Sequence, residues 1–105
     1  MKAEALNELG QTSNAIPLVN QIRNRAGLGN TTATSQADVR LAIWKERRLE
    51  LAFEHDRFFD LVRTGRAISV MGPINGLSNP ENILFPINLN IIRLNPLIEQ
   101  NNFYK

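Results

Sequence analysis

Apolar side chains in the first part of the chain recur at helical spacing. Ala3, Leu6 and Leu9 share one stripe, and Gly10 follows at a position where helices commonly stop. A second stripe with the same spacing consists of Ala15, Leu18, Val19, Ile22 and Ala26. The pattern therefore predicts two short antiparallel helices within residues 1–28.

The ends of the second helix carry recognisable residues. Asn14 is a good N-cap, and Pro17 then falls in the first turn, where its missing N–H removes no intrahelical bond. Gly27 is suited to the left-handed conformation that closes a helix. We expect this helix to begin at Asn14 and to end just before Gly27.

The strongest helical pattern opens at Ser35. Ser35 and Asp38 have the spacing of a capping box, and the helix is predicted to run to about Thr64 with a bend near His55. Its apolar residues lie on two sides, one with Val39, Ile43, Leu49 and Phe53 and the other with Trp44, Leu51 and Phe58. A helix of this kind is contacted on both sides.

Residues 65–105 have the composition of a loop-rich tail. From Gly72 onward, four prolines and eight asparagines argue against long regular elements. The short apolar pieces 83–87 and 91–94 are expected to pack the tail onto the helices. The predicted fold class is all-α, within at most one domain over residues 1–105: a helix pair (1–28), one long, bent helix (35–64) and the tail (65–105).

Composition excludes several classes of function. The net charge of +2 arises from 12 basic and 10 acidic residues that are interleaved along the chain, a pattern that does not favour nucleic-acid binding. The absence of cysteine removes disulfides, thiolate chemistry and cysteine zinc sites. No apolar run approaches the roughly 18 residues of a membrane span, and the first residues lack the apolar region of a signal peptide.

The segment from Glu46 to Asp60 is the densest cluster of charge. Glu46, Glu50 and Glu54 share one helical face, which is how paired acids for hydrolysis or a two-metal site are presented. Arginines lie within reach of every carboxylate, and an arginine lowers the pKa of a carboxyl beside it. Since buried charges must be paired, we predict a structural ion-pair network of Glu46, Arg47, Glu50, Glu54, Arg57 and Asp60.

The remaining candidate residues point to no catalytic site. His55 is the only histidine, and Glu54 and Asp56 project about 100° to either side of it on a helix, so the three do not converge on one metal ion. No serine or threonine has a base arranged beside it, and the glycines are too scattered to form a phosphate loop. We therefore expect no catalytic residue, no cofactor and no metal, and hence no enzyme.

Three other positions have both a binding and a structural interpretation. Trp44 and Tyr104 can each stack on a sugar ring, but the helical spacing favours a core position for Trp44, and an anchor for the tail is favoured for Tyr104. The RNR step (Arg23 to Arg25) can contact phosphate, although arginines at the end of a helix usually interact with its dipole and with solvent.

Several segments, taken together, resemble the C-terminal portion of the SusD/RagB family. They are KAEALNELG (2–10), NQIRNRAGL (20–28), ERRLELAFEHDRFFDLVRTG (46–65), LFPIN (84–88) and LNPLIEQNNFYK (94–105). Three positions depart from the family pattern: His55 stands where the family usually has glycine, Asn88 where it has proline, and residues 102–104 replace a Pro-Gly-Tyr-like ending.

The resemblance implies an all-helical protein with tetratricopeptide-like helix pairs and a loop-rich remainder. It further implies a lipoprotein exposed on the surface of the outer membrane, which binds starch-like glycans or other nutrients without altering them. Membrane attachment through a lipid anchor and a SusC-type TonB-dependent transporter as partner are also implied. The residues that contact glycan vary among members, so the ligand-binding residues of this chain stay unknown, and the matched motifs resemble scaffold.

Two other classes of function stay open. One is a tetratricopeptide-like protein-binding module, which binds peptide rather than glycan. The other is a glycosidase that uses Glu50 and Glu54 as its acid pair.

Overall fold

The computed structural model describes residues 1–105 and confirms the all-α fold class. It contains six α-helices and two short 3-10 helices and no strand. The chain forms two compact units, Met1–His55 and Asp56–Lys105. No helix combines the length and the apolar character needed to cross a bilayer.

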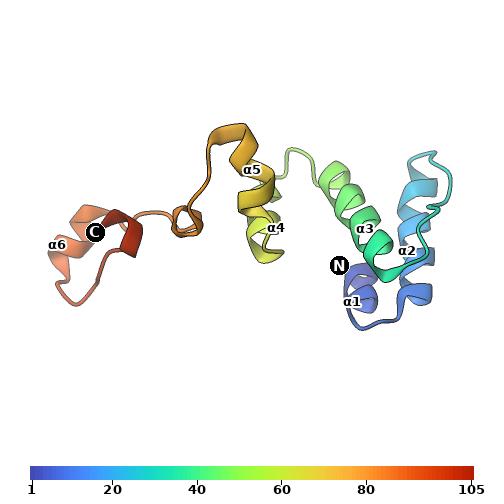
Figure 1. Ribbon diagram of the computed structural model, residues 1–105, viewed down its shortest axis with the longest axis horizontal. Coiled ribbons are helices and arrows are strands. Elements are labelled where there is room, and N and C mark those ends of the chain that lie inside the picture. Colours follow the sequence, from blue (N-terminus) through green and yellow to red (C-terminus); the bar gives the residue numbers. More distant parts are fainter. The chain divides into compact units, whose positions relative to one another are not determined.

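The first unit consists of three helices, α1 (Lys2–Glu8), α2 (Thr12–Arg25) and α3 (Gln36–Glu50). As predicted, α1 and α2 form an antiparallel pair joined by a tight turn (Figure 1). In contrast, α2 and α3 run side by side in the same direction, because the linker between them folds back along α2 (Figure 1). The side chain of Asn20 accepts a hydrogen bond of 2.8 Å from the Thr31 N–H and so holds the linker against α2.

The core of the first unit lies between these parallel helices. It consists of Ala15 and Val19 from α2 and Val39 and Ile43 from α3, each at most 5% exposed. Each pair is spaced by one helical turn, which places both residues on the same face. Partly buried side chains from α1, α2 and the linker pack around this core: Ala3, Leu6, Ile16 and Ala33.

Most of the predicted helix ends are confirmed. Gly10 and Gly27 have positive φ angles of 76° and 74°, and each follows the C-cap residue of its helix, Leu9 for α1 and Ala26 for α2. Ser35 caps α3: its hydroxyl accepts from the Asp38 N–H at 3.1 Å and donates to the Asp38 carboxylate at 2.6 Å. The local pattern was therefore sufficient at these ends.

The predicted start of α2 at Asn14 is wrong. The helix begins at Thr12, whose hydroxyl donates to Asn7 at 2.9 Å, and Asn14 lies inside its first turn. Pro17 consequently lies within the helix rather than in its first turn. Its missing N–H leaves the carbonyl of exposed Ser13 to solvent, which makes this position tolerable.

The bend expected near His55 is a complete break. Helix α3 ends at Glu50, and α4 (Arg57–Arg63) begins only after a turn over residues 51–56. In this turn Phe53 and His55 have φ angles of 69° and 61°, in the left-handed region that an α-helix does not use. The Phe53 side chain, expected on an apolar helix face, is 99% exposed.

The second unit begins with two short helices, α4 and α5 (Ala67–Asn75). They are joined at Gly65, where the Arg66 N–H donates to the Leu61 carbonyl at 2.8 Å, and Leu61 and Ala67 are buried. Helix α5 occupies part of the segment predicted to be loop-rich, and Gly76 ends it in a left-handed conformation.

The rest of the second unit contains only η1 (Pro80–Ile83), α6 (Leu89–Leu94) and η2 (Asn102–Tyr104), as the proline and asparagine content predicts. The ring of Phe85 lies 6.2 Å from that of Phe58 in α4, which ties this part of the tail to a helix. Leu84 and Leu94 are 57% and 86% exposed, however, so the expected packing of the apolar pieces onto the helices is only partly realised.

Candidate functional site

Two carboxylates of α3 pair with arginines of α2. The Arg23 guanidinium donates to Glu46 at 2.5 Å, and Arg25 forms an ion pair with Glu50. Because α2 and α3 run in the same direction, the last turn of one lies beside the last turn of the other. The two ion pairs therefore connect the C-terminal ends of the two helices.

The two ion pairs differ in their exposure to solvent. The side chains of Arg23 and Glu46 are 22% and 12% exposed, whereas those of Arg25 and Glu50 are 64% and 42% exposed. The burial expected for Glu50 and Glu54 is wrong, since both residues are exposed. Glu54 also lies beyond the end of α3, so it does not share a helical face with Glu46 and Glu50.

The other charged residues of the predicted network have different neighbours. Arg47 donates to the Met1 sulfur at 3.3 Å in the first unit. In the second unit Asp60 is buried and accepts from Arg63 at 2.7 Å, while Arg57 is half-buried. The six residues are divided between the two units, so a single network that joins them stays a prediction.

Sequence reasoning missed the pairing of Arg23 and Arg25 with α3, because it assigned both arginines to the helix dipole and to solvent. A hint lies in the length of the linker, residues 26–35. A 14-residue helix is about 21 Å long, and this linker can span about 30 Å when extended. The chain is thus long enough to return to the start of α2 before α3 begins.

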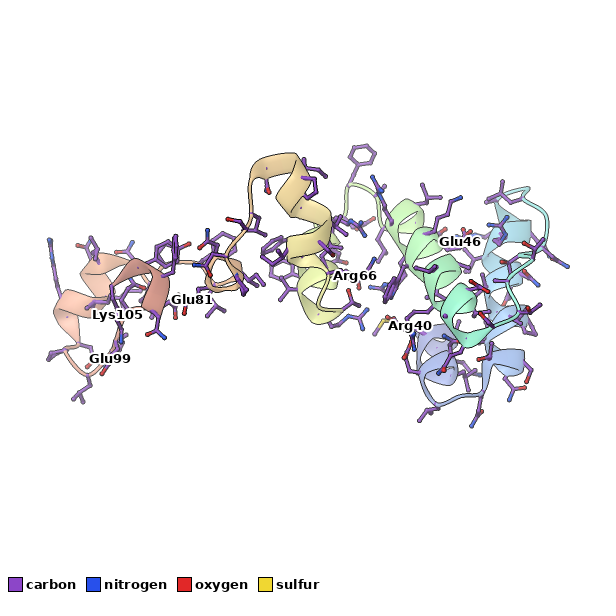
Figure 2. All side chains as sticks on the ribbon, in the orientation of Figure 1. Arg40, Glu46, Arg66, Glu81, Glu99 and Lys105 are labelled. Atoms are coloured by element: carbon purple, nitrogen blue, oxygen red, sulfur yellow. The ribbon has the colours of Figure 1, made fainter.

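A buried polar junction joins α1 to the start of α3. The fully buried Asn7 side chain donates to the Gln36 carbonyl at 2.9 Å, and the Gln36 amide donates to the Asn7 carbonyl at 2.6 Å. Arg40 donates two hydrogen bonds to the Glu8 carboxylate, at 2.6 and 2.7 Å. Arg40 is labelled in Figure 2, near the place where α3 passes α1. These bonds lower the pKa of the Glu8 carboxyl from its ordinary value.

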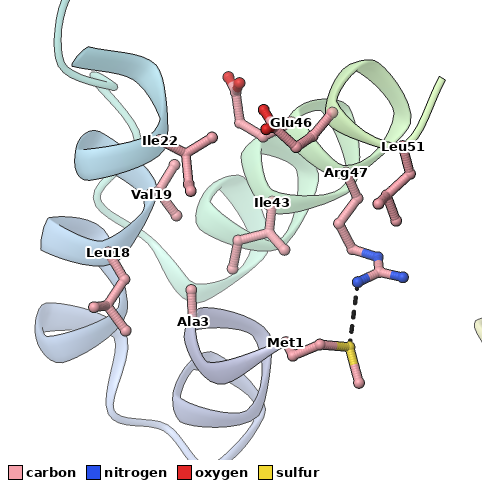
Figure 3. A pocket seen from close by; sticks show the side chains of 10 residues that line it. Met1, Ala3, Leu18, Val19, Ile22, Ile43, Glu46, Arg47 and Leu51 are labelled. Atoms are coloured by element: carbon pink, nitrogen blue, oxygen red, sulfur yellow. Dashed lines mark hydrogen bonds between the residues drawn. The ribbon is translucent and has the colours of Figure 1, made fainter. Parts of the chain in front are cut away.

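An apolar hollow of about 270 Å³ opens between the three helices of the first unit (Figure 3). Ala3, Leu18, Val19 and Ile43 line it, and Glu46, Arg47 and Glu50 stand at its charged rim. Figure 3 shows the Arg47 side chain reaching across to Met1. All three rim residues have partners within this unit: Glu46 and Glu50 pair with arginines of α2, and Arg47 donates to the Met1 sulfur.

A larger and more polar hollow, of about 650 Å³, lies in the second unit between α6 and η2. Its lining combines an arginine, an aromatic ring and amide side chains: Pro86, Ile87, Asn88, Leu89, Asn90, Arg93, Gln100 and Tyr104. No titratable carboxylate side chain belongs to this lining. The lining therefore offers side-chain hydrogen-bond donors, from Arg93, Tyr104 and the asparagines, and no acidic group.

The aromatic and metal-binding candidates occupy separate places. Trp44 is half-buried and lies outside the core of α2 and α3, and Tyr104 is 38% exposed with its ring packed edge-on against Phe103. His55 is exposed in the turn after α3. No three side chains of the metal-binding kind are grouped together in the structure.

The sequence of this chain is similar to the sequences of proteins from one family. The profile of the SusD family matches residues 1–76. SusD-like protein P38 of Formosa agariphila is 46% identical over 110 aligned residues, which cover 96% of this chain and 22% of that protein. SusD-like protein P25 of the same bacterium is 33% identical and covers 93% of this chain and 21% of its own length.

Solved structures show the same likeness. A SusD superfamily protein from Bacteroides thetaiotaomicron superimposes with a TM-score of 0.77 at 32% identity, covering 98% of this chain and 24% of that one. A SusD-like protein from Bacteroides fragilis also gives a TM-score of 0.77, at 30% identity, with 95% and 23% covered. The chain thus spans about a fifth of the length of the curated relatives that it matches.

Proposed function

Since this chain belongs to the SusD family, we propose that it works as part of a cell-surface protein that binds glycans or similar nutrients for uptake. The observation that carries the proposal is the 46% identity to a SusD-like protein along 96% of the chain. A match of this extent includes the helix pair, the break after α3 and the tail, so it reflects more than a shared helical pattern.

In this proposal the protein delivers its ligand to a SusC-type TonB-dependent transporter in the outer membrane. A lipid anchor attaches it to the outer face of that membrane. The ligand is handed over unaltered, so the role is binding and not catalysis. These features come from the family resemblance.

Within that function, the first unit is best suited to be scaffold. Six of its charged side chains pair between helices, as the bonds of Glu46 to Arg23 and of Glu8 to Arg40 illustrate. Its hollow is lined mainly by aliphatic side chains and lacks an aromatic ring on which a sugar can stack. The binding of ligand is accordingly expected away from this unit.

Affinity electrophoresis against a panel of polysaccharides tests the proposal. Retardation of the protein in a gel that contains one of these glycans, with no sugar released from it, is the expected result. Release of product from any glycan contradicts the non-catalytic role and directs attention to Glu50 and Glu54, whose substitution by glutamine then tests the acid pair. Selective binding of peptides in place of glycans favours a tetratricopeptide-like module.

A further inference from the structure

The hollow between α6 and η2 has the chemistry of a binding site for an acidic sugar. We propose that it holds a uronic acid unit of an oligosaccharide, with the carboxylate on Arg93 and the pyranose ring on Tyr104. This inference rests on the proposed function, since it assigns a class of glycan and a place on the chain to it. The family resemblance does not imply a ligand contact for Arg93 or for Tyr104.

Arg93 supplies the positive charge. Between residues 82 and 105 the charged side chains are Arg93, Glu99 and Lys105, and the last two pair with each other at 2.9 Å (Figure 2). The guanidinium of Arg93 forms no ion pair or hydrogen bond in the structure and lies exposed at the hollow. A guanidinium has the planar donor geometry that binds a carboxylate through two parallel bonds.

Tyr104 supplies an aromatic face. Its ring is held edge-on by Phe103, with ring centres 5.0 Å apart, and it stays 38% exposed. An apolar ring face packs well against the C–H face of a pyranose, and the phenol hydroxyl is free for a sugar hydroxyl. This geometry agrees with a sugar-stacking role better than with a buried anchor.

Amide groups complete the lining. The Asn88 oxygen accepts from the Asn90 N–H at 2.9 Å, which leaves the NH₂ group of Asn88 as an available donor, and both asparagines line the hollow. Such donors suit the hydroxyl groups of a sugar.

The hollow is held open by Gln100. Its side-chain oxygen accepts from the N–H groups of Ile87, at 2.8 Å, and of Asn101, at 3.0 Å, and its amide donates to the Ile87 carbonyl at 2.9 Å. Asn101 adds a bond of 2.6 Å to the Phe85 carbonyl. These bonds hold residues 85–87 against residues 100–101. The site is therefore formed before any ligand binds, which lowers the entropic cost of binding.

The test uses the isotope-labelled 105-residue chain and tetragalacturonate as the probe, followed by NMR. We expect saturable shifts of the Tyr104 and Ile87 amide signals and of the Arg93 side-chain Nε–H. Arg93→Gln should weaken binding about fivefold, as is typical for an exposed charge pair. Tyr104→Ala should weaken it as well, because the stacking face is lost.

Two matched controls distinguish recognition of the carboxylate by Arg93 from nonspecific electrostatic attraction between the probe and the chain. Arg48→Gln removes the same charge from an exposed arginine of α3, far along the chain from the hollow, and should leave binding unchanged. Methyl-esterified tetragalacturonate keeps the sugar rings but lacks the carboxylate, and should bind as weakly to the parent chain as the acid does to Arg93→Gln. Equal binding of ester and acid, or equal weakening by Arg48→Gln, overturns the proposal.

The outcomes also separate this inference from the proposed function. Retardation by polysaccharides that is unaffected by Arg93→Gln retains the glycan-binding function and eliminates this site. Absence of any shift with the uronate eliminates the site in the same way, whatever the polysaccharide gels show. Uronate binding that depends on Arg93, without retardation by any polysaccharide, supports the site and contradicts polysaccharide capture.

Discussion

Asn7 and Gln36 exchange two hydrogen bonds that fasten the end of α1 to the start of α3. The Asn7 side chain donates to the Gln36 carbonyl at 2.9 Å, and the Gln36 side chain donates to the Asn7 carbonyl at 2.6 Å. Asn7 also accepts from the Thr12 hydroxyl, so one fully buried amide serves three helices. A buried amide with all these bonds made specifies one arrangement of the helices.

Replacing Asn7 by alanine should therefore destabilise the first unit. The change leaves the Gln36 carbonyl and the Thr12 hydroxyl without this partner and creates a small cavity, at a cost of about 2 to 3 kcal/mol. Hydrogen exchange of the Val39 and Ile43 amides, which belong to the core of this unit, measures the loss. Asn14→Ala, at an exposed position of α2, is the matched control and should change the exchange by less than about 0.5 kcal/mol. Equal effects of the two changes would show that the hydrogen bonds of Asn7 do not stabilise the first unit.

Asn7 also shows which part of this fold can be predicted from sequence. The helix stop at Gly10 and the cap at Ser35 depend on neighbours within a few residues, and both were predicted correctly. Asn7 itself looks like an ordinary polar residue of a short helix, because its partner Gln36 is far away in sequence. The start of α2 was misplaced for the same reason, since the bond from Thr12 to Asn7 is not visible in a local pattern.

The two ion pairs between α2 and α3 should differ in strength. A double-mutant cycle on Arg23 and Glu46, with Arg23→Met and Glu46→Gln, should give a coupling of about 1 to 2 kcal/mol, because these side chains are largely shielded from solvent. The same cycle on Arg25 and Glu50 should give less than about 0.5 kcal/mol, since that pair is exposed. The free energies come from the same hydrogen exchange. Equal couplings in the two cycles would contradict the role assigned to solvent shielding.

The candidate sites were predicted less well than the helices. Glu46 and Glu50 were predicted to belong to an ion-pair network within residues 46–60, whereas the ion pairs that they form in the structure are with Arg23 and Arg25 of another helix. Helical spacing shows which side chains share a face and not which element packs against that face. Of the residues that line the hollow beside Arg93, sequence reasoning singled out only Tyr104. The loop that forms this hollow is closed by hydrogen bonds between Ile87 and Gln100, and a local sequence pattern does not show bonds between such distant positions.

The Glu8 carboxyl should titrate below its ordinary pKa of 4.5. The hydrogen bonds from Arg40 stabilise the ionised form and hold the pKa down. A carboxyl whose pKa is lowered by folding contributes stability above its unfolded pKa and loses it as the pH falls through the folded value. The contact of α1 with α3 should thus weaken below about pH 4.5. A carbon NMR titration of the Glu8 carboxyl measures this, and Arg40→Gln should return the pKa toward 4.5. An unchanged value in that variant would refute the role of Arg40.

Glycine in place of His55 should stabilise the chain. His55 has a φ angle of 61°, a left-handed conformation that costs a residue with a Cβ about 1 kcal/mol or more, whereas glycine adopts it without strain. The SusD resemblance implies glycine at this position, in agreement with the turn that separates α3 from α4. His55 is exposed, so few contacts are lost with the imidazole. After the greater flexibility of glycine in the unfolded chain is included, we expect a net gain of about 0.5 kcal/mol in the free energy of unfolding.

Denaturant unfolding followed by circular dichroism measures this gain. His55→Ala is the control, because alanine keeps the Cβ and should bring no gain. If alanine stabilises the chain as much as glycine does, the imidazole and not the backbone conformation is the source of the effect.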